Sequence, residues 1–379
     1  MSNRIVKNFM RIVVMAVILF VVACSLLSCG TPEFTSEQKQ EIERLVDQTM
    51  SDNDIPGVIV GVWVPGEGEF VLAKGKADIE TGQEIKLADR VRIGSNTKPF
   101  VITVLLQLVD EGKVNLDDTL DKFDFGVEIP NSENITVREC CNMTSGLFNC
   151  TTAEGYQEAL NADLLRKWNP QELVEFAVSN EPYFPPGEGF EYSNTNTILI
   201  GMIIEQITGN DLIKEIQKRI IEPLKLDNTI FPTTPEMTGE HSHGYKFMEE
   251  EGKLLDVTNL LDPSATWAAG AMISNLYDLK TWAKALATGE LISESTQKER
   301  LTRVDGTIED LDVKYGLGIF SLDGFIDHAG ELPGYSTAPF YNPEKDATIV
   351  VLLNKQPNNE HLASIKLLQR IAEVVIPKQ

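Results

Sequence analysis

Segments with the composition of buried strands lie near both ends of the chain, whereas its middle is patterned for helices. Residues 57–64 and 69–73 are apolar and β-branched, and the Pro-Gly-Glu-Gly sequence between them predicts a hairpin. Similar segments return near the C-terminus, at 314–320, 324–328, 336–341 and 347–353. Because the two groups can pair only if the chain ends meet, we expect an antiparallel sheet from both ends, flanked by helices, in an α/β fold of the α+β type.

The middle of the chain, about residues 101–286, is predicted to form a largely helical region inserted between the two sheet segments. Amphipathic patterns, capping residues and Pro or Gly breaks predict helices at 170–179, 195–207, 212–221 and 275–287. Two further helices are expected outside this region, at 36–50 and at about 360–375. Clefts form where regions of a fold meet, so we expect an active site at the junction of the sheet and the helical region.

The first 28 residues are typical of a secretion signal rather than of a folded segment. Three basic residues precede an apolar stretch at 12–23, and the first acidic residue is Glu33. This stretch is short for a membrane-spanning helix. The sequence Leu-Leu-Ser-Cys at 26–29 resembles a bacterial lipoprotein cleavage box, which predicts that Cys29 becomes a lipidated N-terminus followed by a tether at 29–40.

This interpretation predicts an exported protein held at the bacterial cell envelope by its lipid anchor, facing the periplasm or the outer surface. Several acyl chains on Cys29 would anchor it firmly, because a single chain binds a bilayer only marginally. Cys24 fits a similar pattern and is the alternative lipidation site. A soluble secreted protein and a retained anchor helix are the two other interpretations.

The chain has 33 Lys and Arg against 57 Asp and Glu, a net charge of −24 at pH 7. Loss of the leader, with three basic and no acidic residues, would leave a net charge of −27. Such a surface repels nucleic acids and anionic lipids, so neither is an expected partner. The remaining chain is long enough for a large core, and we assign residues 41–379 to one domain.

Three cysteines, Cys140, Cys141 and Cys150, would remain after processing. An oxidising compartment permits a disulfide between Cys150 and one of the adjacent pair, and three reduced cysteines are an equal alternative. No histidine or cysteine spacing is typical of a metal site, since His241 and His243 form an isolated pair in a Gly-rich loop. We therefore expect no metal and no cofactor.

The stretch Ser95-Asn-Thr-Lys98 lies between an apolar segment at 91–94 and a strongly apolar helix pattern at 99–109. A serine and a lysine three residues apart on a helix share one face, which brings the amine within reach of the hydroxyl. Burial lowers the pKa of a lysine, and a neutral amine can accept the serine proton. The pattern therefore predicts an activated nucleophile, and a helix cap followed by a snorkelling lysine is the alternative.

Two further copies of the S-x-x-K spacing serve as a comparison. Ser36 with Lys39, and Ser295 with Lys298, lie in polar sequence. There the serine is better interpreted as a helix cap and the lysine as a solvated side chain. Only the copy at Ser95 has apolar sequence on both sides.

Two short segments could supply the proton relay and the oxyanion donors that a serine hydrolase needs. Tyr192 and Asn194 form a Y-x-N sequence at the start of the predicted helix 195–207. His328 begins an H-x-G sequence that follows a predicted strand. Taken singly, each of these residues is more often structural. Tyr192 would then be an aromatic at the rim of the core, Asn194 a helix N-cap and His328 a buried histidine with a local partner.

The three patterns, S-x-x-K at Ser95, Y-x-N at Tyr192 and H-x-G at His328, follow one another along the chain. In this order they resemble the penicillin-recognising serine hydrolases, which include class C β-lactamases, secreted DD-carboxypeptidases and related esterases. The likeness extends over roughly 55–353 and includes shorter matches at 105–112, 144–147 and 315–318. It is closest to the secreted D-alanyl-D-alanine carboxypeptidase branch, and it implies a β-lactamase/transpeptidase-like fold and an acyl-enzyme mechanism.

The resemblance also implies roles for the catalytic side chains. Ser95 would attack a carbonyl, and Lys98 and Tyr192 would share the proton transfers. Which of them is the base in acylation stays open, because the base is disputed for related motifs. His328 stands where many relatives carry a lysine, and it would polarise the cleft or assist the tyrosine.

Four further residues are implied in substrate binding: Asn194, Trp267, Gly330 and Glu331. Asn194 would hold the substrate amide, and Trp267 would line the pocket. The backbone N–H groups of Ser95 and Glu331 would form the oxyanion hole. The expected substrate is a small peptide, an ester or a β-lactam, with peptidoglycan as a candidate source.

Two departures from the family pattern bear on the substrate. Relatives that cleave D-Ala-D-Ala termini usually carry a hydroxyl residue after H/K-x-G, where this chain has Glu331, and the segment after 315–318 lacks the arginine of carboxylate-binding relatives. A carboxylate at 331 would repel a substrate carboxylate. An esterase or a D-amino-acid amidase is therefore the first alternative to a carboxypeptidase or β-lactamase-like enzyme, and a non-catalytic protein that binds peptidoglycan peptides is the second.

Overall fold

The computed structural model describes residues 33–248, 252–356 and 362–376. The expected signal peptide and both candidate lipidation sites, Cys24 and Cys29, lie outside the described residues. No helix among those described is long and apolar enough to cross a bilayer.

A ten-stranded antiparallel sheet forms the centre of the molecule, in the order β3-β2-β1-β14-β13-β11-β10-β9-β8, with β12 paired to β13. The pairing of β1 with β14 joins the two ends of the chain, which confirms the predicted architecture. The strands are β1 (Gly57–Val64), β2 (Gly68–Asp78), β3 (Gln83–Glu84), β8 (Val304–Ile308), β9 (Leu311–Tyr315), β10 (Phe320–Leu322), β11 (Phe325–Asp327), β12 (Gly330–Leu332), β13 (Tyr335–Asn342) and β14 (Ala347–Leu353).

Two small sheets lie beside the large one. The first joins β4 (Val91–Arg92) to β7 (Ile273–Ser274), and the second is the hairpin β5–β6 (Tyr245–Met248 and Lys253–Asp256). The first small sheet matters for the site, because it ties the segment just before Ser95 to the segment just after Ala269.

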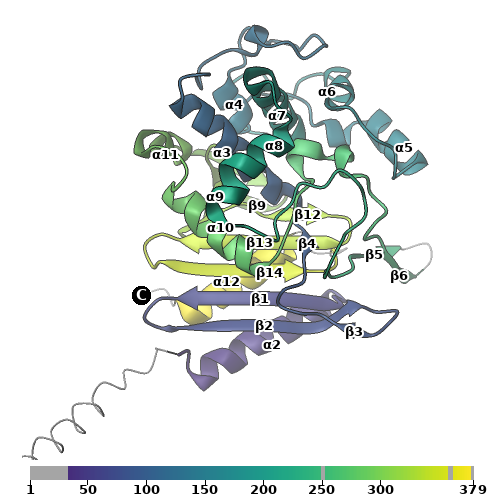
Figure 1. The fold of residues 1–379 in the computed structure, drawn as a ribbon, viewed down its shortest axis with the longest axis vertical. Helices are drawn as coiled ribbons and strands as arrows, with labels where there is room; N and C mark the ends of the chain where they lie inside the picture. The colour runs from purple at the N-terminus through teal and green to yellow at the C-terminus, as the bar shows by residue number, and fades with distance from the viewer. Residues whose placement is uncertain (1–32, 249–251, 357–361, 377–379) are drawn as a thin grey trace, which may run out of the picture.

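Helices cover both faces of the large sheet. Figure 1 shows α3 to α8 gathered above the sheet, with α2 on the opposite side. The helices are α2 (Ser36–Asp52), α3 (Thr97–Asp110), α4 (Val137–Cys141), α5 (Glu154–Ala162), α6 (Pro170–Val178), α7 (Asn194–Thr208), α8 (Leu212–Ile216), α9 (Glu222–Leu224), α10 (Leu276–Thr288), α11 (Glu294–Arg300) and α12 (Ala363–Val375).

The sheet therefore carries a hydrophobic core on each face. Val58, Val60 and Val62 of β1 belong to the core beneath α2 and α12, whereas Ile59 and Trp63 belong to the core shared with α10 and the helical region. Side chains alternate between the faces of a strand, so a strand covered on both faces is apolar at every position. This explains why β1 and β14 appear in the sequence as unbroken apolar segments.

Two predicted elements, at 314–320 and at 212–221, differ from the structure. The expected strand 314–320 is wrong: β9 ends at Tyr315, and a turn separates it from β10. Gly318 in that turn has a φ of 70° and donates its N–H to the carbonyl of Cys141 at 2.8 Å, which takes it out of the sheet. The segment 212–221 continues through a π-helical turn into α9. The structure begins α2 at Ser36, where the helix 36–50 was expected, so this helix overlaps the last residues assigned to the tether.

The three described cysteines, Cys140, Cys141 and Cys150, are free and buried. The structure therefore holds the reduced alternative rather than a disulfide. Burial raises the pKa of each thiol, to about 12 for Cys141 and about 11 for Cys150. These side chains fill the core as small apolar groups.

Candidate active site

Ser95 lies in a single 3₁₀ turn, Gly94–Asn96, that leads directly into α3. The side-chain amide of Asn96 holds this turn against β13, donating to Thr337 Oγ1 at 2.7 Å and to the carbonyl of Ile93 at 3.2 Å. The Ser95 side chain is half-buried and lines a cavity, while its neighbours on both sides are buried. The nucleophile predicted from the sequence is thus held rigidly at the mouth of a cleft.

Lys98 is fully buried, one helical turn after Ser95. Its Nζ lies 2.9 Å from Ser95 Oγ, 2.7 Å from Asn194 Oδ1 and 2.9 Å from the carbonyl oxygen of Ala269. The Asn194 amide is oriented from its other end, since its Nδ2 donates to Thr151 Oγ1 at 2.8 Å. Lys98 is therefore aimed at the serine by two acceptors that come from distant parts of the chain.

Burial lowers the pKa of Lys98 to about 7, because the ammonium form loses its hydration. The Cys150 thiol opposes this shift weakly. A large fraction of the amine is therefore neutral near pH 7.

Tyr192 faces the same amine from across the cleft. Its ring centroid lies 4.9 Å from Lys98 Nζ, and its hydroxyl lies 3.5 Å from His328 Nε2. Burial raises the pKa of Tyr192 above its usual value, and a hydrogen bond to Ser95 opposes that shift. The phenol is therefore protonated at neutral pH and can donate a proton to a neighbouring atom.

His328 is buried behind Tyr192 at the end of β11. Its Nδ1 lies 2.5 Å from the carbonyl oxygen of Ala329, and its Nε2 lies 3.1 Å from the hydroxyl of Tyr315. Burial and the nearby Lys98 lower the pKa of His328 to about 3. The imidazole is therefore neutral at physiological pH.

Two glycines bring the backbones on either side of Ser95 close together. A Cβ on Gly330 would lie 1.9 Å from the carbonyl oxygen of Ile93, and a Cβ on Gly94 would lie 2.9–3.1 Å from backbone atoms of Glu331. Only the absence of both side chains lets β12 approach the serine turn. This approach brings the backbones of Ser95 and Glu331, the expected oxyanion donors, next to each other.

The side chain of Glu331 is held beside the cleft by hydrogen bonds. Its Oε1 accepts from the N–H of Leu362 at 2.9 Å and from Ser336 Oγ at 3.3 Å. Trp267 lies apart from this group: its ring packs against α7, where a Cβ on Gly201 would lie 2.9 Å from it. Trp267 is not among the residues that line the two cavities described next.

Two cavities of about 480 Å³ each meet at the predicted site. Both are lined by Asn194 and Glu331, so they form one cleft with two arms. The catalytic arm contains Ser95, Tyr192 and His328 and is covered by the tip of the β8–β9 hairpin. The aliphatic arm extends between α5 and β6 and is lined by Leu160, Leu164, Leu255, Val257, Leu260 and Leu261.

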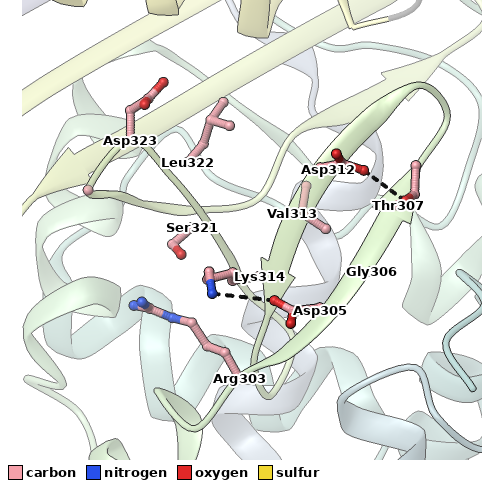
Figure 2. A pocket seen from close by; sticks show the side chains of 11 residues that line it. Arg303, Asp305, Gly306, Thr307, Asp312, Val313, Lys314, Ser321, Leu322 and Asp323 are labelled. Atoms are coloured by element: carbon pink, nitrogen blue, oxygen red, sulfur yellow. Dashed lines mark hydrogen bonds and ion pairs between the residues drawn. The ribbon is translucent and has the colours of Figure 1, made fainter.

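A larger open cavity of about 830 Å³ lies on the other side of the β8–β9 hairpin (Figure 2). Two pairs of its polar side chains contact each other: Lys314 Nζ lies 3.4 Å from Asp305 Oδ1, and Thr307 Oγ1 lies 3.0 Å from Asp312 Oδ1. None of the predicted catalytic residues lines it.

Within the described ranges, no group of three or more His, Cys, Asp or Glu could hold a metal ion. His243, in the isolated pair noted in the sequence, directs its Nδ1 at Asp256 Oδ2, 2.6 Å away.

The sequence did not point to several residues that shape the site. Thr151 and Asn149 orient Asn194 through its side chain and its backbone N–H, respectively. The carbonyl of Ala269 binds Lys98, and Tyr315 binds His328. Thr151 lies in a short 3₁₀ helix, Cys150–Thr152, that Asn149 caps, and the polar sequence there did not suggest a role in the site. Ala269 and Tyr315 both lie in segments that match the family, but neither had an assigned role.

The family model described as Beta-lactamase matches residues 42–373. This span contains the serine, the lysine, the tyrosine and the histidine in one cleft. The chain belongs to the beta-lactamase family. It is therefore a member of a family of serine hydrolases with a β-lactamase/transpeptidase-like fold.

The proteins to which this chain is similar differ in what they are named for. Protein flp of Staphylococcus aureus is 26% identical over 344 residues, 87% of this chain and 66% of that protein, so the chain spans just under two thirds of this relative. A D-stereospecific amidohydrolase from Streptomyces sp. is 31% identical, with a TM-score of 0.79 over 89% of this chain and 98% of that one. D-amino acid amidase from Ochrobactrum anthropi, 24% identical with a TM-score of 0.80 over 90% and 99% of the two chains, shares the fold.

Proposed function

We propose that this protein is a serine amidohydrolase that cleaves amides or short peptides of D-amino acids through an acyl-enzyme. The observation that carries the proposal is the placement of Lys98 Nζ, 2.9 Å from Ser95 Oγ and held by two acceptors. The similarity to a D-stereospecific amidohydrolase at 31% identity supports the choice of substrate class.

Lys98 is the better candidate for the base in acylation. Asn194 Oδ1 and the Ala269 carbonyl can only accept, so they take the two N–H groups of a neutral amine. The remaining lone pair then points at Ser95 Oγ, which donates its proton as it attacks the substrate carbonyl. Burial raises the pKa of Tyr192, so its phenol stays protonated at neutral pH; it has a proton to donate and is not available as the base.

The position of Tyr192, the proposed acid, determines how the substrate lies in the cleft. The leaving nitrogen must lie within reach of the Tyr192 hydroxyl, so the leaving group occupies the catalytic arm of the cleft. The acyl part then extends past Asn194 into the aliphatic arm. Release of the amine leaves an ester on Ser95 Oγ. Water then cleaves that ester: the Tyr192 phenolate takes a proton from the attacking water, and the Lys98 ammonium returns its proton to Ser95 Oγ.

The charges of the cleft argue against a substrate with a free carboxylate. Glu309 and Glu331 line the catalytic arm, and no lysine or arginine is among its lining residues. Lys246 is the one cation among the residues that line the aliphatic arm. A carboxylate on the leaving group would face two carboxylates, which favours an amidase or aminopeptidase over the D-alanyl-D-alanine carboxypeptidase that the sequence suggested first.

The direct test compares purified wild-type protein with Ser95→Ala on matched D- and L-amino-acid amides. We expect hydrolysis of the D-amides by the wild type and a loss of about 10³-fold or more in Ser95→Ala. Ser295→Ala is the matched control, because it removes a serine from the same S-x-x-K spacing on the surface helix α11. Hydrolysis that Ser95→Ala retains would overturn the role of Ser95, and the absence of hydrolysis in the wild type would favour a non-catalytic binding protein.

A second measurement separates an amidase from a penicillin-recognising carboxypeptidase. Intact-protein mass after incubation with a β-lactam and with a D-Ala-D-Ala depsipeptide reports covalent capture and turnover together. We expect D-amide turnover to exceed turnover of the carboxylate-bearing depsipeptide. A lasting acyl adduct on Ser95 with rapid depsipeptide hydrolysis would favour the carboxypeptidase.

We also propose that the protein is exported and anchored through a lipid on Cys29. The basic start, the apolar stretch and the Leu-Leu-Ser-Cys sequence support this. Metabolic labelling with a fatty acid in a bacterial host should mark the wild type and Cys24→Ala but not Cys29→Ala. Labelling that survives in Cys29→Ala would contradict the proposed site.

A further inference from the structure

The imidazole of His328 has one nitrogen, Nε2, near which two phenol hydroxyls lie. The Tyr315 hydroxyl lies 3.1 Å from Nε2, and the Tyr192 hydroxyl lies 3.5 Å from the same atom. The Tyr192 ring also meets the Tyr315 ring edge-on, with the centroids 6.3 Å apart. The two hydroxyls therefore compete for a single acceptor.

The tautomer of His328 follows from its other nitrogen. The Ala329 carbonyl, 2.5 Å from Nδ1, can only accept a hydrogen bond, so Nδ1 carries the proton. In the neutral ring Nε2 is then an acceptor. The ionisable groups around the ring are Lys98, the two phenols and Asp327. Asp327 Oδ1 accepts the backbone N–H of His328. The ring of Phe320 packs against another side of the imidazole, with the ring centroids 5.2 Å apart.

Of the two hydroxyls, that of Tyr315 is the better placed to donate to His328 Nε2. Its side chain is fully buried, and among the described residues His328 Nε2 is the partner that the structure gives to its hydroxyl. A buried hydroxyl without a partner is costly, so its proton points at Nε2. Tyr192 is half-buried beside the cleft, lies at the outer limit of a hydrogen bond to Nε2 and has Ser95 as a second partner.

We propose that Tyr315 is a positioning residue that occupies the lone pair of His328 Nε2 and thereby keeps the Tyr192 hydroxyl turned toward Ser95 and the leaving group. His328 then acts as a fixed, neutral support and exchanges no proton during turnover. The catalytic part of this inference rests on the proposed amidohydrolase function.

Removal of one oxygen atom tests the proposal. In Tyr315→Phe the Nε2 acceptor becomes free, and Tyr192 is drawn to it and away from the serine. We expect kcat for a D-amino-acid amide to fall about tenfold or more at unchanged KM. Tyr335→Phe is the matched control, because it also deletes a fully buried hydroxyl, one that donates to the Ser242 carbonyl at 2.9 Å. Equal kcat in the two variants would overturn the role of Tyr315.

A second readout does not depend on activity. The chain has four histidines, so ¹⁵N spectra of the labelled protein can be assigned by single substitution. We expect a His328 signal with Nδ1 protonated and Nε2 hydrogen-bonded as an acceptor, unchanged from about pH 5 to about pH 9. The Nε2 shift should move in Tyr315→Phe.

Protonated Nε2 in the wild type, or titration of His328 near neutral pH, would contradict the proposal. If the protein hydrolyses no amide or ester, the proposed function fails, whereas the tautomer measurement still decides whether Tyr315 holds His328 Nε2.

Discussion

Asn194 Oδ1 lies 2.7 Å from Lys98 Nζ and turns the amine toward the serine. This contact connects the start of α7 to the first turn of α3, so a change at residue 194 acts on the base without touching Ser95. In Asn194→Asp the new carboxylate would stabilise the ammonium and raise the pKa of Lys98. The neutral amine would then appear only at higher pH.

We therefore expect the rising limb of kcat/KM against pH to move up by about one unit or more in Asn194→Asp, with activity recovering in alkaline buffer. The wild-type limb should rise through pH of about 7, where Lys98 loses its proton. Asn131→Asp, an equal change of charge in an exposed turn, should leave the profile in place. A limb that does not move in Asn194→Asp would argue against Lys98 as the base.

The buried amine also makes stability depend on pH. The pKa of Lys98 is about 7 in the folded protein against an ordinary value of 10.5, so the unfolded chain binds more protons between these values. The free energy of unfolding of the wild type therefore rises with pH across that window. Lys98→Met lacks this term, so its stability relative to wild type should fall by on the order of 2 kcal/mol from about pH 7 to about pH 9. Urea unfolding at both pH values measures the difference, and an equal slope would contradict the low pKa.

Gly330 is predicted to matter for the rate and also for stability. A Cβ at this position would lie 1.9 Å from the Ile93 carbonyl and would push β12 away from the serine turn. Displacing one oxyanion donor costs about 10²–10³-fold in kcat. Gly330→Ala should lose activity of that order while KM and the far-ultraviolet circular dichroism spectrum stay close to wild type. Full activity would show that Glu331 N–H is not a donor.

Glu331→Gln should change which substrates are accepted. A glutamine keeps the side-chain oxygen that accepts from the Leu362 N–H, and it removes the negative charge from the cleft. We expect kcat/KM for carboxylate-bearing peptides to rise about tenfold relative to the corresponding amides. Glu154→Gln on the exposed start of α5 controls for net charge. An unchanged ratio would mean that Glu331 does not select against carboxylates.

The sheet was predictable because its central strands are apolar at every position. β1 has the bounds expected from the sequence, and so does β14. The edge strand β8 and the β5–β6 hairpin were missed, since their sequences are mixed and their pairing is set by neighbours far along the chain. The prediction of a single strand at 314–320 is wrong at Gly318, because the left-handed conformation of this glycine cannot be predicted from the pattern of hydrophobic residues.

The residues of the site likewise fall into two groups, those that the sequence predicted and those that it did not. Ser95, Lys98, Tyr192, Asn194 and His328 could be predicted because their three short motifs follow one another in the order of a known family, and the structure brings these residues together. Their supports could not be found, because they act through contacts that close only in three dimensions. Lys98 is held by the carbonyl of Ala269, and Asn194 by Thr151, and both partners lie in short 3₁₀ helices far along the chain from the residues that they hold.

The antiparallel pairing of β1 with β14 has a consequence for how the protein is made. β1 is made before the other described strands, and its inner neighbour β14 is made after them. Until β13 and β14 have been made, both cores are incomplete and the serine turn lacks the contact between Asn96 and Thr337. We therefore expect the large sheet and the cleft around Ser95 to form only after this segment has been synthesised.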